Sequence, residues 1–262
     1  MEAFETIVLS FKDHIARLTL NRSEVRNAFN DKMVHELRLA LGICAAEGEA
    51  RILVLTGADP AFCAGADYAW MQKMVDFDQV ENVRDAAALA ALFEHVSRFP
   101  KPTIARVNGH AMGGGLGLAA ACDLVVASED AQFGFPEVRL GLVPATISPY
   151  VMERMGAAAC RRYFLTGERF PAVKAFQMGL VDELAPAKEL DAAVAKLTEH
   201  LLHGGSRAQS ACKELIRRVR GEDLERVNEY TAGLIARLRV GAEGQEGLRA
   251  ALARRRPAWR EE

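Results

Sequence analysis

The sequence predicts an α/β fold with an at least partly parallel sheet, followed by a helical C-terminal extension. Strand-like and helix-like segments alternate up to about Met152, and beyond it the strand-like segments nearly vanish. No long Pro/Gly/Ser linker and no internal repeat separates the two parts. We therefore expect an α/β core over residues 1–195 and a helical extension over residues 196–262, which serves oligomerisation and is not an independent domain.

A β-hairpin is expected at the N-terminus. Hydrophobic residues alternate with polar ones over residues 7–11, and a second apolar segment covers residues 15–20. The segment Lys12–His14 between them has the composition of a turn. The first two strands should therefore be antiparallel neighbours.

The next segments continue the alternation. Asn30 occupies the position of a helix N-cap, and apolar residues then recur at steps of three and four as far as Cys44. Residues 52–55 form a short apolar run typical of a buried strand. The other expected elements are, in order, a helical stretch through Phe93, a strand over Thr103–Val107, a helix over residues 116–121 and a strand over residues 124–126.

Two apolar stripes at the helical period occupy the last third of the chain. They consist of Leu190, Val194, Leu197 and Leu201, and of Ala208, Cys212, Leu215 and Val219. Such faces must be buried on the chain's own core or on another subunit. We therefore expect an oligomer.

Composition excludes several classes of protein. The 262 residues are 50% hydrophobic and 26% charged, which excludes a disordered chain, a collagen-like chain and a disulfide scaffold. The 33 basic and 35 acidic side chains give a net charge of −2, so no overall basic field attracts nucleic acid or an anionic membrane. The N-terminal residues lack the features of a signal peptide, and no apolar stretch approaches the roughly 20 residues of a membrane span. A cytoplasmic protein without nucleic-acid or membrane partners is expected.

Several motif-based functions are also excluded. The five cysteines are odd in number, widely spaced and mostly set in apolar runs, which favours reduced, buried thiols, and the absence of a CxxC pair argues against a zinc site. The chain has no GxxxxGK phosphate loop and no GxSxG elbow. Gly115, Gly117 and Ala120 fit a degenerate dinucleotide fingerprint, but no acidic residue ends a clear second strand after it. We expect no metal.

Two loops rich in glycine and alanine lead from strands into helices. They cover Ala61–Asp67 and Asn108–Gly117. Small side chains leave the backbone accessible, and free N–H groups at a helix start stabilise a negative oxygen. Facing each other, the two loops would form an oxyanion hole; taken singly, each is also explained by tight turns or close packing.

Four segments together carry a family resemblance. They are Ala64–Asp67, Asn108–Gly115, Cys122–Leu124 and Phe133–Glu137. In order and spacing they resemble the signature blocks of the crotonase, or enoyl-CoA hydratase/isomerase, superfamily, and the resemblance covers essentially the whole chain. It implies a crotonase-like spiral of ββα units, a helical trimerisation region in a homotrimer or dimer of trimers, and an acyl-CoA thioester as substrate, with CoA as part of the substrate and no separate cofactor.

The resemblance also implies roles for individual residues. The two oxyanion N–H donors fall on Ala66 and Gly114, and the acid/base carboxylate falls on Glu137, which by itself also fits a carboxylate that offsets a helix dipole. The implied substrate and CoA contacts are Glu24, Val25, Arg26, Ala28, Ala64, Asp67, Tyr68, Gly113 and Gly117. Charge for the CoA phosphates is a further expectation for the run Arg254–Arg256, for which a solvated tail is the alternative.

One departure from the family pattern leaves the reaction open. The second glutamate of the hydratases should occupy the position of Gly117, so only one carboxylate is present. A single glutamate suffices to move a proton between the α- and γ-carbons of a 3-enoyl thioester, so a Δ3-Δ2 isomerase is the alternative to a hydratase. A catalytically silent CoA- or RNA-binding protein on the same fold is the third.

The loop chemistry further resembles the bacterial methylglutaconyl-CoA hydratase branch of leucine degradation. The segments that carry this resemblance are Gly113–Gly117, Ala131–Phe133, Glu137–Leu142 and Pro144–Pro149. In that case Gly117 is expected to leave room for a substrate branched at C3.

Overall fold

The computed structural model describes residues 4–260, which pack into two units. The larger unit runs to Phe99 and continues over Thr103–Ala195; the smaller unit takes Pro100–Pro102 and the chain from Lys196 onward. The larger unit combines strands and helices in an α/β fold, and the smaller is helical.

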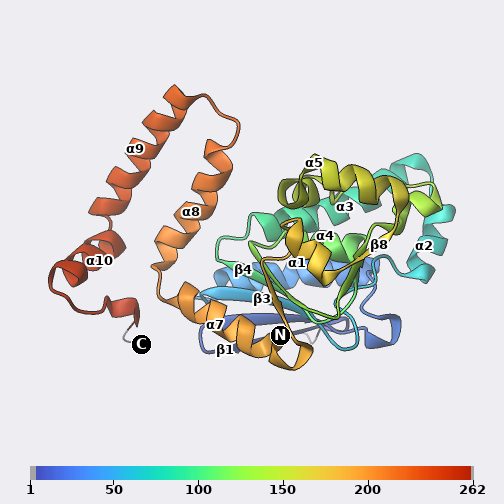
Figure 1. The fold of residues 1–262 in the computed structure, drawn as a ribbon, viewed down its shortest axis with the longest axis horizontal. Helices are drawn as coiled ribbons and strands as arrows, with labels where there is room; N and C mark the ends of the chain where they lie inside the picture. The colour runs from blue at the N-terminus through green and yellow to red at the C-terminus, as the bar shows by residue number, and fades with distance from the viewer. Residues whose placement is uncertain (1–3, 261–262) are drawn as a thin grey trace. The chain divides into compact units, whose positions relative to one another are not determined.

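A mixed sheet forms the base of the larger unit (Figure 1). Its order is β1 (Ile7–Lys12), β2 (Ile15–Leu20), β3 (Ile52–Gly57), β4 (Thr103–Val107), β6 (Leu124–Ser128) and β9 (Glu183–Ala185). The β1–β2 pair is antiparallel and every other pair in this sheet is parallel. Asp13 and His14 both have positive φ, which gives the tight turn the twist that a two-residue hairpin requires. The predicted hairpin and partly parallel sheet are confirmed.

A second, smaller sheet was not expected. It contains β5 (Ala111–Met112), β7 (Gln132–Gly134) and β8 (Arg169–Pro171), with β5–β7 parallel and β7–β8 antiparallel. After Met152 the described residues contain only the strands β8 and β9, in agreement with the expectation that strands nearly vanish there. Each has only three residues, too few to show an alternating pattern.

Helices cover the sheet on the side that carries the core. They are α1 (Asp31–Ala46), α2 (Tyr68–Val75), α3 (Gln79–Ser97), α4 (Gly114–Ala120), α5 (Ser148–Thr166) and α6 (Ala172–Gln177), with 3-10 turns η1 (Ser23–Val25), η2 (Pro136–Leu140) and η3 (Ala187–Glu189). Asn30 caps α1 as predicted, because its side-chain oxygen accepts the Met33 N–H at 2.8 Å. Asp78 and Glu81 form a capping box at the start of α3, so the expected single helical stretch is divided into α2 and α3.

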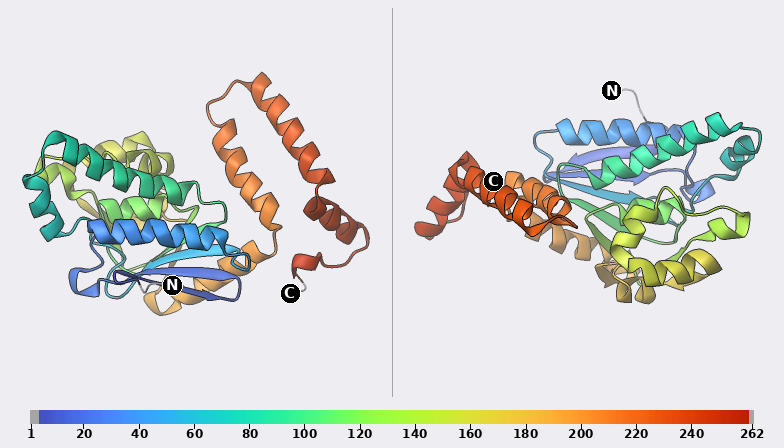
Figure 2. Two further views of the ribbon diagram at one scale, coloured as in Figure 1. Left: turned by 180° about the vertical axis from the view of Figure 1, so that it is seen from behind. Right: turned by 90° about the horizontal axis from the view of Figure 1, so that it is seen from above.

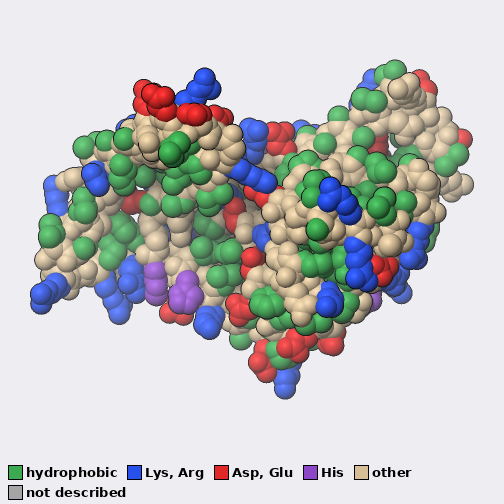
Figure 3. Space-filling model, turned by 45° about the horizontal axis from the view of Figure 1, so that its top comes forward, with side chains coloured by type: hydrophobic (Ala, Val, Ile, Leu, Met, Phe, Trp, Pro, Cys, Tyr) green, Lys and Arg blue, Asp and Glu red, His purple; other side chains and the backbone are tan. Residues whose placement is uncertain are grey.

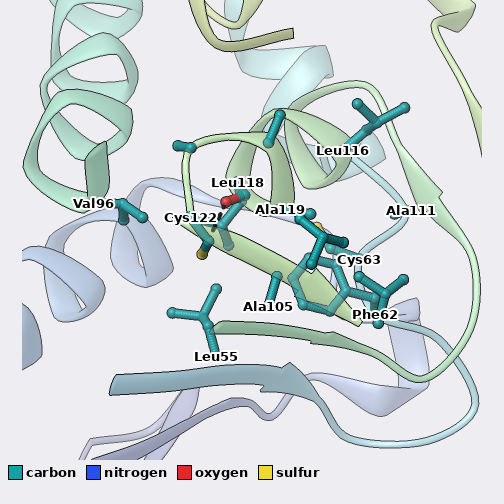
Figure 4. Packing of buried hydrophobic residues seen from close by; sticks show 14 of the residues in the cluster. Leu55, Phe62, Cys63, Val96, Ala105, Ala111, Leu116, Leu118, Ala119 and Cys122 are labelled. Atoms are coloured by element: carbon teal, nitrogen blue, oxygen red, sulfur yellow. Dashed lines mark hydrogen bonds between the residues drawn. The ribbon is translucent and has the colours of Figure 1, made fainter. Parts of the chain in front are cut away.

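The short helix α4 lies in the centre of the hydrophobic core (Figure 4). Its side chains Leu116, Leu118 and Ala119 pack above β3 and β4, which contribute Leu55 and Ala105. Every cysteine is a free thiol, and all are buried except Cys212, which is exposed. The expectation of buried, reduced thiols therefore holds for the larger unit.

The opposite face of the sheet binds the start of α7 (Leu190–Leu202). Arg106 points away from the core, as its position between Ala105 and Val107 requires, and donates two hydrogen bonds to Asp191, at 2.8 and 3.0 Å. The sheet therefore packs against the hydrophobic core on one face and is hydrogen-bonded to α7 on the other.

The smaller unit consists of helices and turns. They are the end of α7, α8 (Ser206–Val219), α9 (Leu224–Val240), α10 (Ala242–Leu252) and the 3-10 turn η4 (Ala258–Arg260). Figure 2 shows α8 and α9 side by side and antiparallel. Glu243 accepts hydrogen bonds from the first N–H groups of α8, and Glu246 binds Arg255, which lowers the pKa of Glu246 to about 2. The Arg255 guanidinium is thus bound within the chain, and the expectation that the arginine run supplies charge to the CoA phosphates stays a prediction.

The surface agrees with the charge balance of the sequence. Figure 3 shows basic and acidic side chains intermixed over the face that it draws. None of the helices within residues 4–260 is long and apolar enough to cross a membrane.

Candidate active site

The two predicted glycine-rich loops lie side by side. Cys63 in the first loop pairs with Ala111 in the second as an isolated parallel bridge. The Cys63 N–H donates to the His110 carbonyl at 3.1 Å, and the Met112 N–H donates to the Cys63 carbonyl at 3.0 Å. The backbone therefore holds the segments leading to Ala66 and Gly114 next to each other.

Close packing explains two of the glycines in these loops. A Cβ at Gly115 would lie 2.5 Å from the carbonyl oxygen of Cys63, and Gly65 has φ +95° with its α-carbon against the carbonyl of Met112. Neither position accepts a side chain without movement of the backbone. The packing explanation and the functional one thus apply to different residues of the same loops.

The N–H groups of Ala66 and Gly114 are both free of hydrogen bonds to residues 4–260. Phe29 binds the neighbours of Ala66: its N–H donates to the Gly65 carbonyl at 2.7 Å, and its carbonyl accepts the Asp67 N–H at 2.8 Å. The Ala66 N–H therefore points away from Phe29. Gly114 is the first residue of α4, where an N–H has no acceptor within the helix.

Phe29 lies beside both donor residues, Ala66 and Gly114. A Cβ at Gly114 would lie 3.3 Å from the Phe29 ring, and Phe29 forms a bridge with Ala66. Within the part of the chain that the structure describes, neither the Ala66 N–H nor the Gly114 N–H has a hydrogen-bond partner. Two unused N–H donors beside the same phenylalanine are groups of the kind that stabilise a negative oxygen.

The carboxyl group of Glu137 lies beside Gly113, the residue before α4. It lies in η2, and its Oε1 is so close to the α-carbon of Gly113 that a Cβ there would be 2.9 Å away. Its Oε2 is buried and has no partner among residues 4–260. Burial raises the pKa of Glu137 above its ordinary value, and a hydrogen bond from its own N–H opposes the rise only in part. A buried carboxylate oxygen without a partner makes ionisation of the group costly, which is typical of a functional acid or base.

Gly113 is therefore expected to be essential for the position of Glu137. Gly113→Ala would add a Cβ at φ +49° against Oε1, and should lower kcat/KM by roughly 100-fold, the cost of displacing a reacting group by about 1 Å. Gly221→Ala is the control, because Gly221 has φ +72° with open space around it. Steady-state kinetics on both variants check this, and equal losses in both would contradict it.

The expected CoA loop borders the first of these loops. Glu24, Val25 and Arg26 are exposed, whereas Ala28 is buried. The Arg26 carbonyl accepts the Ala64 N–H at 3.0 Å, which ties the two segments together. Tyr68, at the start of α2, is 88% exposed and free to contact a ligand.

Two of the expected substrate-contact residues, Asp67 and Gly117, contact other parts of the chain. The Asp67 carboxylate is buried, binds Arg22 at 2.7 Å and caps α2 through the Ala69 N–H at 2.7 Å, so it is committed within the chain. Gly117 was expected to leave room for a substrate branch, and this is wrong. A Cβ at Gly117 would overlap Ile147 Cγ2 and lie 2.5 Å from Ile147 Cβ, because the buried Ile147 side chain fills that space.

Sequence reasoning did not single out Arg22, Phe29 or Ile147. Arg22 and Phe29 flank the expected CoA contacts Glu24–Ala28. The sequence therefore indicated this segment but not the contacts that Arg22 and Phe29 make. Ile147 lies within the segment Pro144–Pro149, in which the Ser148 hydroxyl donates to the Ala145 carbonyl at 2.8 Å as an ordinary turn contact. Among residues 4–260 no cluster of His, Cys, Asp and Glu side chains could hold a metal ion.

Known proteins match this chain over nearly its full length. A family model described as enoyl-CoA hydratase/isomerase matches residues 10–262. Crotonyl-CoA hydratase of Syntrophomonas wolfei is 31% identical, with 97% of each chain covered, and 2,3-dehydroadipyl-CoA hydratase of Escherichia coli is 31% identical, with 97% of this chain and 98% of that protein covered. The crystal structure of an enoyl-CoA hydratase from Shewanella pealeana has a TM-score of 0.95 at 38% identity and covers 98% of this chain and 96% of its own.

Proposed function

The chain belongs to the enoyl-CoA hydratase/isomerase family, and on that basis we propose that it adds water reversibly to a 2-enoyl-CoA thioester. The observation that carries the proposal is the Glu137 carboxyl group, which lies beside Gly113, one residue before Gly114, and whose Oε2 is buried without a partner among residues 4–260. The site needs an acyl-CoA substrate and no separate cofactor.

The proposed chemistry follows from these groups. The N–H groups of Ala66 and Gly114 bind the thioester oxygen, where negative charge collects as an enolate forms; each such donor is worth about 100- to 1,000-fold in rate. The Glu137 carboxylate takes a proton from water, whose oxygen bonds to C3 while the C2–C3 π electrons move onto the thioester. The proton then passes from Glu137 to C2, which restores the carboxylate and completes the addition of water.

We further propose a branched or dicarboxylic substrate such as 3-methylglutaconyl-CoA. The run Pro144–Pro149 and the similarity to a 2,3-dehydroadipyl-CoA hydratase support this substrate class. The space beside Gly117 does not, because Ile147 occupies it.

The position of the Ile147 side chain supports the isomerase alternative. With the apolar Ile147 side chain beside Gly117, that position supplies no second carboxylate to hold water. A Δ3-Δ2 isomerase needs no water, because one carboxylate can carry a proton between the α- and γ-carbons.

Assays with crotonyl-CoA, 3-methylglutaconyl-CoA and a 3-enoyl-CoA distinguish these functions. A hydratase removes the conjugated thioester absorbance of either or both of the first two substrates. Turnover of the 3-enoyl-CoA alone, with appearance of that absorbance, would replace hydration by isomerisation. Binding of all three without turnover would show a CoA-ester-binding protein.

The pH dependence of hydration should report the burial of Glu137. The base must be ionised, so kcat/KM is expected to fall as the pH decreases through a pKa above the ordinary glutamate value of 4.5. A pH profile of kcat/KM with a 2-enoyl-CoA measures this limb. An acid limb at or below the ordinary glutamate value would contradict the assignment.

We propose a homotrimer or a dimer of trimers in the cytoplasm. Within the described chain, neither α8 nor α9 has a fully buried residue, although both are amphipathic, and Ile216, Leu224 and Val240 are among their exposed apolar side chains. Other copies of the chain are the proposed cover for these faces.

A further inference from the structure

A buried ion pair lies directly beside the proposed oxyanion donor Ala66. The Arg22 guanidinium binds the Asp67 carboxylate at 2.7 Å, and the two side chains are only 16% and 8% exposed. Isolated, either charge would be costly at such a depth. The pair is therefore either a purely structural contact or a part of the site.

Both partners are fixed at several atoms. Asp67 donates its N–H to Phe29, and its Oδ1 accepts the Ala69 N–H at 2.7 Å and the Trp70 N–H at 3.4 Å. Arg22 donates a second guanidinium hydrogen bond to the Ala28 carbonyl at 2.7 Å. Each partner is thus held in one geometry, as a positioning device requires.

A buried asparagine fixes the Arg22 backbone. The Arg22 N–H donates to Asn27 Oδ1 at 2.9 Å, and the Asn27 amide donates to the carbonyls of Ala58 and Ala61 at 2.7 and 2.8 Å. Asn27 is fully buried. The segment containing Arg22 is consequently tied to the strand-to-loop connection that leads to Ala66.

We propose that Arg22, acting through Asp67, is a positioning residue for the Ala66 N–H. This inference rests on the proposed function of Ala66 as an oxyanion donor. The direction of that N–H depends on the peptide planes around Ala66, and Asp67 fixes the following plane through its backbone and side chain. Without the Arg22 charge, the buried Asp67 carboxylate must rotate or admit water, and the turn at Ala66 loosens.

The kinetic signature should distinguish positioning from substrate binding. The oxyanion contact strengthens as negative charge develops, so a misaligned Ala66 N–H lowers kcat more than it raises KM. Arg22→Met is expected to lower kcat by roughly 10- to 100-fold, less than the full value of an oxyanion donor, because the N–H is displaced and not removed.

A vibrational measurement tests the position of the donor directly. A saturated acyl-CoA labelled with ¹³C at the thioester carbonyl is bound to the full chain, and its infrared C=O stretch is compared with that of free ligand. Hydrogen bonds from Ala66 and Gly114 should lower the frequency in the unsubstituted protein, and Arg22→Met should reverse part of that shift. Arg22→Lys should restore part of both kcat and the shift, because it keeps the charge but not the two-armed contact.

Arg154→Met is the matched control. Arg154 is a similarly buried arginine, 12% exposed, which binds Asp182 at 3.1 Å and the carbonyls of Cys122 and Asp123. Its loss should lower the melting temperature with kcat and the C=O frequency unchanged. If Arg22→Met does the same, Arg22 is purely structural and the inference is overturned.

Two further outcomes can be distinguished: a variant that does not fold, and a failure of the proposed oxyanion function. If Arg22→Met does not fold, Arg22→Lys and Asp67→Asn decide, since unchanged kcat and C=O frequency in both would overturn the inference. If the unsubstituted protein binds the ligand without any lowering of the C=O frequency, the oxyanion function itself fails, and with it this inference. A normal shift that is unaffected by every Arg22 substitution overturns the inference alone.

Discussion

Glu137→Gln is expected to lower kcat by roughly 100- to 10,000-fold, the range that general acid–base catalysis contributes. The amide has nearly the same shape but cannot take a proton from water, and Oε2 has no other group among residues 4–260 to share that task. Binding of the thioester should persist, because the N–H groups of Ala66 and Gly114 are backbone groups that the substitution leaves in place. Turnover of a 2-enoyl-CoA and the dissociation constant of a saturated acyl-CoA measure the two effects.

The same variant should be at least as stable as the unsubstituted protein at neutral pH. Because burial raises the pKa of Glu137, ionisation of this group costs more in the folded chain than in the unfolded chain. Its contribution to folding stability is therefore present below the unfolded pKa and lost as the pH rises through the folded pKa. Glutamine lacks that loss, so the difference in melting temperature between Glu137→Gln and the unsubstituted protein should grow with pH.

Glu129→Gln is the matched control for both measurements. Glu129 is exposed and its side chain lies outside the two loops, so its substitution should change neither kcat nor the melting temperature appreciably. Near-normal turnover in Glu137→Gln would remove Glu137 from the mechanism. A large loss of stability in that variant would mean that its carboxylate has a structural partner.

Local patterns were sufficient to predict much of the fold. The hairpin turn at Asp13, the cap at Asn30 and the apolar stripe of α1 each depend on residues close together in the sequence, and all three are present. The strands β5, β7, β8 and β9 were missed because two or three residues are too short for periodicity. Their existence depends on pairing partners far along the chain.

The candidate site divides in the same way. The contiguous small residues indicated the two loops, whereas Ala66, Gly114 and Glu137 were assigned through the family resemblance. The Arg22–Asp67 pair spans 45 residues of sequence, and neither partner shows a local sign of the other. The Gly117–Ile147 contact likewise cannot be predicted from the sequence. The sequence around a glycine does not show whether the space beside its α-carbon is open or is occupied by a side chain from elsewhere in the chain.

Gly117→Ala should be strongly destabilising for this reason. Its Cβ would overlap the Ile147 side chain in the core, and overpacking of this kind typically costs about 1–3 kcal/mol in the free energy of unfolding. Gly42→Ala is the control: Gly42 is an exposed residue of α1 with nothing near its missing Cβ, so this change should stabilise by about 1 kcal/mol through helix propensity. Denaturant unfolding of the two variants gives opposite signs if Ile147 lies where the structure has it.

A double-mutant cycle with Ile147→Gly isolates the contact. Ile147→Gly alone should destabilise, because it removes a buried side chain. In that background Gly117→Ala should become neutral or stabilising, since the three atoms nearest to the added Cβ all belong to the side chain that has been removed, and alanine favours the helix. Additive effects would show that Ile147 does not fill the space beside Gly117. The site would then have room on that side for a substrate branch or a second polar group, and the observation that favours isomerisation over hydration would be lost.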